Sequence, residues 1–356
     1  MSDMDYFDQL ELYEDLEDEF KNLPKIKNTP PVRKPARLKG RPNPHIKPGA
    51  EAKEVADLEE QVDELRDYEF TYQASRHERQ WIIDSLGGFF EQQWFDDVLR
   101  LVKGGKEASV YLCTADPSTS AKYIAAKVYR PRRFRNLKND HLYREGRDRL
   151  DGNGNLILDG GMNHAMDKRT AYGLELMHTS WIEHEYQTML ILETAGADIP
   201  QPYGRGNNAI LMEYIGSPEM PAPTLNSVKL DMGEAVELYK RVLWNIDLML
   251  SKDRIHGDLS AFNLLYWEGQ LTLIDFPQAI EPRRNRNAYS IFERDVLRVC
   301  EYFSRQGVRV KPRRLAAEMW TAHGHRLDPE VHPRLLDDQD EADLAYWRSL
   351  QDSKKR

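Results

Sequence analysis

The chain has 356 residues, of which 40% are hydrophobic and 31% charged, enough to bury the core of one large or two small globular domains. Its formal net charge of -9 argues against a general nucleic-acid binder. The acidic start lacks the features of a signal peptide, and no apolar run reaches the roughly eighteen residues of a membrane span. Two well-separated cysteines, Cys113 and Cys300, lie in apolar runs typical of buried thiols. We therefore expect a cytoplasmic protein without a membrane segment.

The first 50 residues contain two segments of opposite charge. Residues 1–20 carry nine acids and no base, whereas residues 21–50 carry nine Lys or Arg, seven prolines and no acid. Such a composition cannot bury enough apolar surface to offset the entropy of ordering, so it predicts a disordered tail over 1–50. Two interpretations stay open: a solvated tail, or a tail whose acidic part docks a partner while its basic part, 21–48, contacts RNA or a ribosomal particle.

A helical lead-in is predicted next, over residues 51–84. Within it, apolar residues recur at three- and four-residue steps between Val55 and Leu65, the spacing of a surface helix. Two β-rich runs follow, residues 98–114 and 122–130, separated by a turn-prone stretch. They predict the start of an antiparallel sheet.

A glycine pair separates two strand-like parts of the first β-rich run. Gly104 and Gly105 precede Lys106, Glu107 and Ser109. Small residues in such a turn let backbone N–H groups approach phosphate oxygens, although a Gly-Gly hairpin without a ligand reads the same way. The Walker A pattern is absent. The signal therefore indicates a phosphate loop only in combination with other residues.

A lysine in the second β-rich run supplies one such residue. Lys127 stands among apolar neighbours, and a buried ammonium needs an acidic or phosphate partner. Protein kinases place a strand lysine after a Gly-rich loop to hold phosphates. The helix predicted to start near Trp181 carries Glu185 on its apolar face, whereas Glu183 points elsewhere. We therefore expect Lys127 to pair with Glu185; an outward-facing lysine is the alternative.

Two further strands and a helix lead to the most informative motif. The strands are predicted across the turn in residues 203–217. Their end would be the adenine-binding hinge of a two-lobed kinase, which is indicated only by its position in the order of the elements. The hinge residues are Met212, Glu213, Tyr214 and Ile215. A helix of period 3.6 follows, over about 232–253.

The motif itself is HGDLSAFNLLYWEGQLTLIDFP, residues 256–277. Phosphoryl transfer needs one carboxylate to orient the attacking hydroxyl, and oxygen ligands to hold the magnesium that neutralises the phosphates. Asp258, Asn263 and Asp275 follow the spacing and order of the protein-kinase motifs, with a strand expected to end at Asp275. Pro277 stands where most kinases carry a glycine. The constellation predicts an ATP- and Mg²⁺-dependent phosphotransferase.

In these motifs the chain resembles the RIO family of atypical serine/threonine protein kinases. The resemblance covers roughly residues 85–307 and rests on VKGGKEASVYL, AAKVYR, WIEHEYQTML, LMEYIG, HGDLSAFNLL, IDFPQA and SIFERDVLRVCEYFSRQGV. It implies an α+β, bilobal protein-kinase-like fold without a long activation segment. The antiparallel-sheet N-lobe would span 85–215, and the mainly helical C-lobe would span 216–356.

The resemblance also implies roles for the motif residues. Asp258 would be the catalytic Asp, Asn263 and Asp275 metal ligands, Lys127 the ATP-positioning lysine and Glu185 its partner. The family implies serine phosphorylation, often of the enzyme itself, and in some members an ATPase cycle through a phosphorylated Asp at the position of Asp275. The phosphate loop and hinge described above would then bind ATP.

An unusual insert is expected within the N-lobe, over residues 131–179. Its basic part, 130–149, could contact RNA, a ribosomal particle or an acidic partner, or form a solvated loop. Two other functions stay open for the whole chain: a small-molecule phosphotransferase, and a nucleotide-gated binding module in ribosome assembly. The sequence does not identify a protein substrate.

Overall fold

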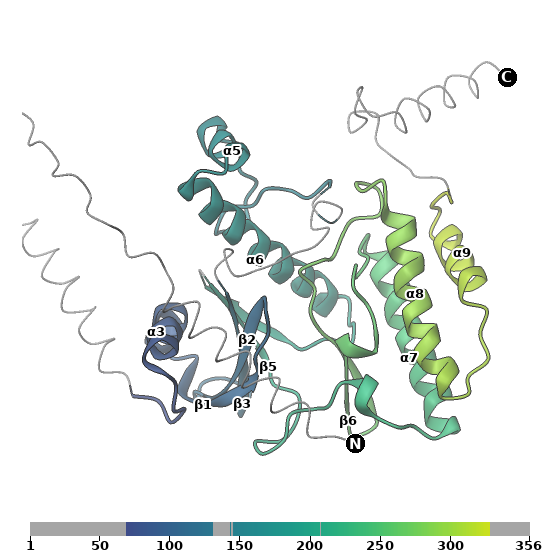
Figure 1. Ribbon diagram of the computed structural model, residues 1–356, viewed down its shortest axis with the longest axis horizontal. Coiled ribbons are helices and arrows are strands. Elements are labelled where there is room, and N and C mark those ends of the chain that lie inside the picture. Colours follow the sequence, from purple (N-terminus) through teal and green to yellow (C-terminus); the bar gives the residue numbers. More distant parts are fainter. Residues whose placement is uncertain (1–68, 131–142, 144, 207, 328–356) are drawn as a thin grey trace, which may run out of the picture. The chain divides into compact units, whose positions relative to one another are not determined.

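The computed structural model describes residues 69–130, 143, 145–206 and 208–327 (Figure 1). The chain divides into two compact units, Met1–Tyr68 and Glu69–Arg356, and every described residue belongs to the second. The predicted tail and the periodic stretch of the lead-in therefore lie outside the described residues. Among the helices that are described, none is long and apolar enough to cross a membrane.

A five-stranded antiparallel sheet forms the first part of this unit. Its order is β1-β2-β3-β5-β4, so β3 lies at the centre between β2 and β5. The strands are β1 (Phe95–Lys103), β2 (Ala108–Ala115), β3 (Tyr123–Tyr129), β4 (Pro202–Arg205) and β5 (Ala209–Glu213). Six successive residues of β3 are buried. Helix α3 contacts β1 and β3, and helix α6 contacts β4 and β5.

Helix α3 (Arg76–Glu91) crosses the boundary expected between lead-in and N-lobe at residue 85. The side chain of Ser75 caps it by accepting the Glu78 N–H. The glycine pair inside the helix does not end it, since Gly87 is buried against the lobe. The helix stops only before Gln93, whose φ of 57° lies in the left-handed region.

Two helices, α5 (Gly160–Asp167) and α6 (Ala171–Thr194), occupy the second half of the predicted insert. Helix α6 therefore begins inside the predicted insert, because residues 171–179 are its first turns. Thr170 causes this early start: its Oγ1 accepts the Gly173 N–H at 3.0 Å, which makes it an N-cap.

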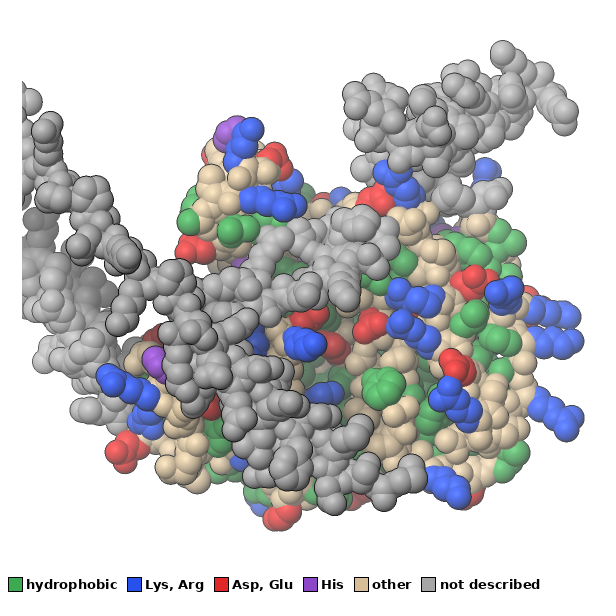
Figure 2. Space-filling model, in the orientation of Figure 1, with side chains coloured by type: hydrophobic (Ala, Val, Ile, Leu, Met, Phe, Trp, Pro, Cys, Tyr) green, Lys and Arg blue, Asp and Glu red, His purple; other side chains and the backbone are tan. Residues whose placement is uncertain are grey.

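The C-lobe is mainly helical, and Lys and Arg side chains gather along the edge that α8 and α9 form (Figures 1 and 2). Its core joins α6, α7 and α8 to α9 through buried apolar side chains from Tyr129 to Trp320. The elements are η2 (Leu225–Ser227), α7 (Met232–Ser251), η3 (Ala261–Asn263), β6 (Leu264–Trp267), β7 (Gln270–Leu273), α8 (Ala288–Arg305) and α9 (Pro312–Ala322).

The hairpin β6–β7 turns at Glu268 and Gly269, whose φ values of 49° and 80° suit a tight turn. Its second strand ends at Leu273, so the expectation that the strand runs to Asp275 is wrong by two residues. The φ of Asp275 is 73°, a left-handed conformation that no strand residue can keep. Between Asp275 and α8 the chain has room for only a short connection.

The α+β, kinase-like fold class is confirmed.

A strap, defined as Tyr143 and residues 145–150, lies against the C-lobe segment 277–294. Arg284 binds Asp148 with two contacts, at 2.5 and 2.7 Å, and Arg286 Nε lies 2.6 Å from Glu145 Oε1. Gly146, with φ 76°, packs so close that a Cβ would overlap the Arg284 carbonyl. The strap is thus seated on the C-lobe by paired charges and by a position that accepts only glycine.

Two described arginines of the basic segment 130–149, Arg147 and Arg149, are engaged within the chain. Arg147 Nη2 donates to the carbonyls of Pro277 and Ala279, at 2.7 and 3.0 Å, and Arg149 Nη2 lies 2.6 Å from Asp167. These two guanidinium groups are occupied by contacts within the chain, so they do not support the prediction that this segment contacts RNA. Most of its other basic residues lie outside the described part of the chain.

Candidate active site

Lys127 joins the sheet to the C-lobe. It lies on the central strand β3, opposite Val110 of β2 and Ile210 of β5. Its side chain lies on the face of the sheet where α6 and Asp275 are found. Its Nζ lies 2.6 Å from Glu185 Oε1 on α6 and 2.6 Å from Asp275 Oδ1. The pair expected with Glu185 is present, and Asp275 makes a second one.

Burial and charge oppose each other in this trio. The Glu185 side chain is 1% exposed and that of Lys127 11%. Burial alone would lower the pKa of Lys127 and raise that of Asp275, yet mutual attraction holds the pKa of Lys127 above and that of Asp275 below its usual value. Tyr129 donates its hydroxyl proton to the second oxygen of Glu185, at 2.7 Å. The charged forms of Lys127 and Asp275 are therefore favoured, and the contacts of Glu185 hold the ammonium in place.

Glu183 is a residue whose surroundings the sequence did not predict. It is buried and forms an ion pair with Arg205 of β4. The apolar periodicity of α6 assigns only one face to the core, whereas the middle of this helix is covered on two sides, by β4 and by the C-lobe. Arg205, the one charged residue of the short strand β4, was the available signal.

The predicted phosphate loop is the turn between β1 and β2. Gly104, Gly105, Lys106 and Glu107 form the turn, and Ser109 is the second residue of β2. Ser109 faces Val128 in the strand register, so the turn adjoins Lys127. Their phosphate-binding role stays a prediction.

The predicted hinge is where β5 leaves the sheet. Met212 and Glu213 end β5, and Tyr214 and Ile215 lead into the C-lobe. Arg100 of β1 donates to the Tyr214 hydroxyl at 3.0 Å, which fixes the start of this connection. The structure thus places the four residues at the crossing between lobes, and their adenine contacts stay a prediction.

The loop that carries Asp258 is held by buried groups. His256 donates from Nε2 to the Ile274 carbonyl at 3.1 Å and accepts the Asp258 N–H at Nδ1, which fixes the neutral tautomer. Burial lowers the pKa of His256, in agreement with that neutral state. Gly257, with φ 82°, lies so close to the Gln278 carbonyl that a Cβ would overlap it. His256 thus braces the loop.

Asp295 of α8 also anchors the loop that carries Asp258. Its Oδ2 accepts the Gly257 N–H at 2.8 Å. Burial raises the pKa of Asp295 to about 7, although Arg294 and the backbone N–H groups of the loop oppose this. Sequence reasoning missed Asp295, since a single acid on an amphipathic helix is more often solvated.

Asn263 and Asp275 offer oxygen atoms of the kind that Mg²⁺ prefers. Asn263 Nδ2 donates to the Asp258 carbonyl at 2.9 Å, so the amide oxygen of Asn263 is left for a ligand. Asp275 uses Oδ1 for Lys127 and keeps Oδ2. No cluster of three or more His, Cys, Asp or Glu among the described residues could hold a metal alone. The two side chains fit an ion whose remaining ligands are phosphate and water.

The loop after Asp275 is anchored on two sides. His184, next to Glu185 on α6, contacts the Ala279 carbonyl through Nε2 at 2.8 Å, and Arg147 of the strap donates to the same carbonyl. Burial lowers the pKa of His184 to about 3, so the imidazole is neutral and Nε2 is the donor. Helix α6 therefore fixes both the partner of Lys127 and the loop that follows Asp275.

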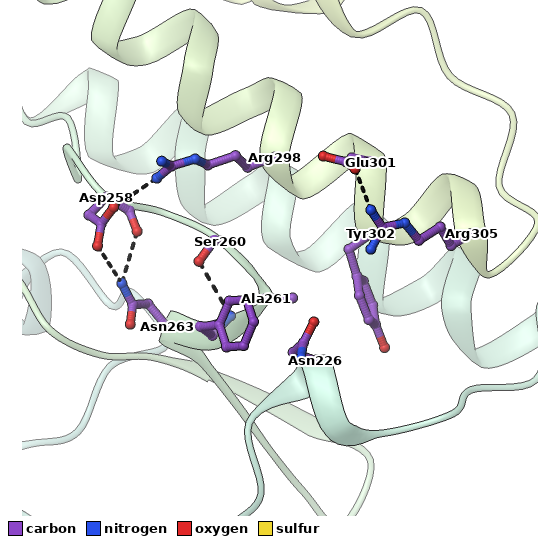
Figure 3. Close-up of a pocket in the computed structure, with 10 residues that line it drawn as sticks. Asn226, Asp258, Ser260, Ala261, Asn263, Arg298, Glu301, Tyr302 and Arg305 are labelled. Atoms are coloured by element: carbon purple, nitrogen blue, oxygen red, sulfur yellow. Dashed lines mark hydrogen bonds and ion pairs between the residues drawn. The ribbon is translucent and has the colours of Figure 1, made fainter. Parts of the chain in front are cut away.

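Asp258 also has a partner that sequence reasoning missed. Arg298 of α8 lies with Nη1 2.7 Å from Asp258 Oδ1, on the opposite side of the carboxylate from Asn263 (Figure 3). The two residues are 40 positions apart, and no sequence pattern links them. Asp258 thus has Asn263 on one side and the more exposed Arg298 on the other.

Comparison with known proteins agrees with these features. Residues 159–315 match the RIO domain. The chain is 32% identical over 132 residues to the RIO-type serine/threonine-protein kinase Rio1 of Thermoplasma acidophilum, covering 37% of this chain and 68% of that one. It is 34% identical over 135 residues to human serine/threonine-protein kinase RIO1, covering 38% of this chain and 24% of that one.

A solved structure also resembles the chain, a Rio2 kinase–ADP/Mg²⁺–phosphoaspartate complex from Chaetomium thermophilum. Its TM-score is 0.49 at 19% identity, covering 77% of both chains. The matched region spans about a quarter of the human relative and about two thirds of the archaeal one. With the RIO domain match and an archaeal relative covered over 68% of its length, the chain belongs to the RIO family.

Proposed function

We propose that the chain is an ATP- and Mg²⁺-dependent serine/threonine protein kinase that transfers the γ-phosphate of ATP to a protein serine, its own included. The observation that carries the proposal is the position of Lys127, which lies 2.6 Å from both Glu185 and Asp275 and so joins sheet and C-lobe at one point. Membership of the RIO family and the names of its relatives, serine/threonine-protein kinases, support the same activity.

Each group has a task in this reaction. Lys127 and the β1–β2 turn bind the phosphates, while Glu185 keeps the ammonium in place. Asn263 and Asp275 would hold Mg²⁺, which supplies positive charge to the phosphates when it is bound. Asp258 orients the acceptor hydroxyl and takes its proton. The backbone of residues 212–215 binds the adenine at the crossing between the lobes.

Three further expectations belong to this proposal. A cytoplasmic location is supported by Cys113 and Cys300, which are buried and free. A small-molecule acceptor is disfavoured because the RIO relatives are named protein kinases. An ATPase cycle remains the second outcome, because the Asp275 side chain is 40% exposed and so accessible to a phosphoryl group. Contact with RNA or a ribosomal particle stays a prediction.

The test is incubation of the purified chain with Mg²⁺ and γ-labelled ATP beside Asp258→Ala and Asp275→Ala. We expect acid-stable label on serine that both substitutions remove. Phosphate release with little stable label would identify an ATPase instead. Nucleotide binding without any turnover would contradict an enzymatic function altogether.

A further inference from the structure

A cavity of about 430 Å³ opens beside Asp258, on the side where Arg298 lies (Figure 3). Its walls come from η2, from the loop and short helix η3 that follow Asp258, and from one face of α8. Phe262 of η3 lies at its rim with 60% of its surface exposed, although it is a large apolar residue. Asp258 and Asn263, which have tasks in the proposed reaction, line one side of the cavity, and none of those tasks uses Phe262 or the α8 residues.

The α8 wall is a stripe of four residues. Arg298, Glu301, Tyr302 and Arg305 follow one another at steps of three, four and seven residues, so they share one face of the helix. Tyr302 forms the floor, because it is buried and donates its hydroxyl proton to the Val228 carbonyl at 3.0 Å. The charged members stand above it, in solvent.

Both arginines hold carboxylates of the chain itself. Arg298 binds Asp258, and Arg305 forms an ion pair with Glu301. The side chains of the first pair are 41% and 39% exposed, and those of the second 69% and 63%. Pairs so exposed are weak and exchange partners easily. An incoming carboxylate can therefore replace either one, and the guanidinium plane suits two parallel hydrogen bonds to it.

Positive charge continues beyond the cavity. Residues 305–314 contain five Lys or Arg and no acid. Arg309, Lys311 and Arg313 among them are exposed. The edge formed by α8 and α9 is rich in Lys and Arg in the space-filling view (Figure 2). We call Arg298, Arg305 and this exposed continuation the basic track. The positive charge of the basic track complements an acidic peptide that would lie with one end beside Asp258 and continue along α8.

We propose that the cavity and the basic track form the acceptor subsite, and that the acceptor is a serine or threonine with acidic neighbours in an extended peptide. This inference rests on the proposed kinase function. A carboxylate beside the acceptor takes the place of Asp258 on Arg298, which releases Asp258 for the hydroxyl. The acceptor oxygen then bonds to the γ-phosphorus, the bond from that phosphorus to the β–γ bridging oxygen breaks, ADP leaves, and the hydroxyl proton passes to Asp258.

The test uses three serine peptides of equal length whose flanks are Asp/Glu, Asn/Gln or Lys, with labelled ATP and the full chain. We expect kcat/KM to be about tenfold higher for the acidic peptide than for the amide peptide, and lowest for the Lys peptide. Arg305→Gln should raise KM for the acidic peptide more than for the amide peptide. Arg298→Gln should do the same and, because it also releases Asp258, should reduce the ratio of kcat/KM between the acidic and the amide peptide. Arg283→Gln, which removes an exposed arginine outside the cavity, should keep the wild-type preference.

Equal kcat/KM for all three peptides would overturn the subsite, as would an Arg298→Gln variant that loses activity equally on each. A second measurement applies even without turnover: fluorescence anisotropy of a labelled acidic peptide in the presence of Mg-ADP. We expect binding to the wild type that weakens in both arginine variants. Peptide binding of this kind without phosphoryl transfer would refute only the kinase. Arginine-dependent binding of single-stranded RNA, with no peptide preference, would refute the acceptor subsite.

Discussion

Two carboxylates of the site, Asp275 and Asp258, are about equally exposed, at 40% and 39%, but the cations that they bind lie in very different surroundings. Asp275 meets Lys127, whose side chain is 11% exposed and has Glu185 as a second partner at 2.6 Å. Asp258 meets Arg298, where both side chains are about four-tenths exposed, 39% and 41%. Since removing one member of a buried pair leaves an unpaired charge, the first contact is rigid, whereas the second is cheap to exchange. The chain thus keeps its nucleotide side fixed and its acceptor side adaptable.

The largest effect is expected where the buried trio is broken. Lys127→Met leaves Glu185, 1% exposed, without its cation, so it should abolish turnover and lower the free energy of unfolding by about 3 kcal/mol. Urea denaturation and a γ-label assay measure the two effects. Lys122→Met is the matched control, because Lys122 is an exposed residue directly before the same strand. A Lys127→Met variant as stable as this control would show that the trio is not a rigid element.

The nucleotide side is also where sequence reasoning was most informative. Lys127 stood out as a charge in an apolar strand, and the spacing of Asp258, Asn263 and Asp275 is a local property of one short loop and hairpin. The pairing with Glu185 followed from one helical face. These inferences need only periodicity and the rule that a buried charge seeks a partner.

An intermediate effect is expected from acid, through His184. Its pKa of about 3 in the folded chain lies below the usual 6.5, so the unfolded state binds the proton first, and the stability from neutral His184 is lost as pH falls below 6.5. Between pH 7.5 and pH 5 the free energy of unfolding falls by about 2 kcal/mol because of His184. His256, whose pKa is also lowered, acts in the same sense, whereas Asp295, whose pKa is raised to about 7, acts in the opposite one.

Because these contributions overlap, the measurement is a difference between two proteins. Urea unfolding of wild type and His184→Gln at both pH values should show that the variant gains about 2 kcal/mol relative to wild type on acidification. Gln retains an amide donor for the Ala279 carbonyl. Identical pH profiles for the two proteins would mean that His184 is not neutral in the folded chain.

The smallest effect on stability is expected on the acceptor side. Arg298→Gln removes an exposed ion pair and should change the free energy of unfolding by no more than about 0.5 kcal/mol. Thermal denaturation beside the wild type measures it. A loss of unfolding free energy close to that of Lys127→Met would mean that Arg298 is structural. The two regions would then not differ in rigidity.

The acceptor side is also what the sequence could not predict. The contact of Arg298 with Asp258 joins an α8 side chain to a loop 40 residues earlier and depends on how α8 is rotated in the C-lobe. The strap is similar: its arginines read as a surface for a partner, yet Arg147 donates to the carbonyls of Pro277 and Ala279. Likewise, Thr170 as an N-cap moved the start of α6 into the predicted insert. Such contacts arise from tertiary packing, which local patterns do not encode.

The most direct test of the two-region account is Mg-ATP titration calorimetry combined with turnover, on Asp258→Asn beside Asp275→Asn. We expect Asp258→Asn to bind Mg-ATP with the wild-type Kd while turnover falls by about a hundredfold or more. Asp275→Asn should lose the Mg²⁺-dependent part of binding as well as turnover. Equal loss of binding in both variants, or wild-type turnover in Asp258→Asn, would contradict the division between a fixed nucleotide side and an adaptable acceptor side.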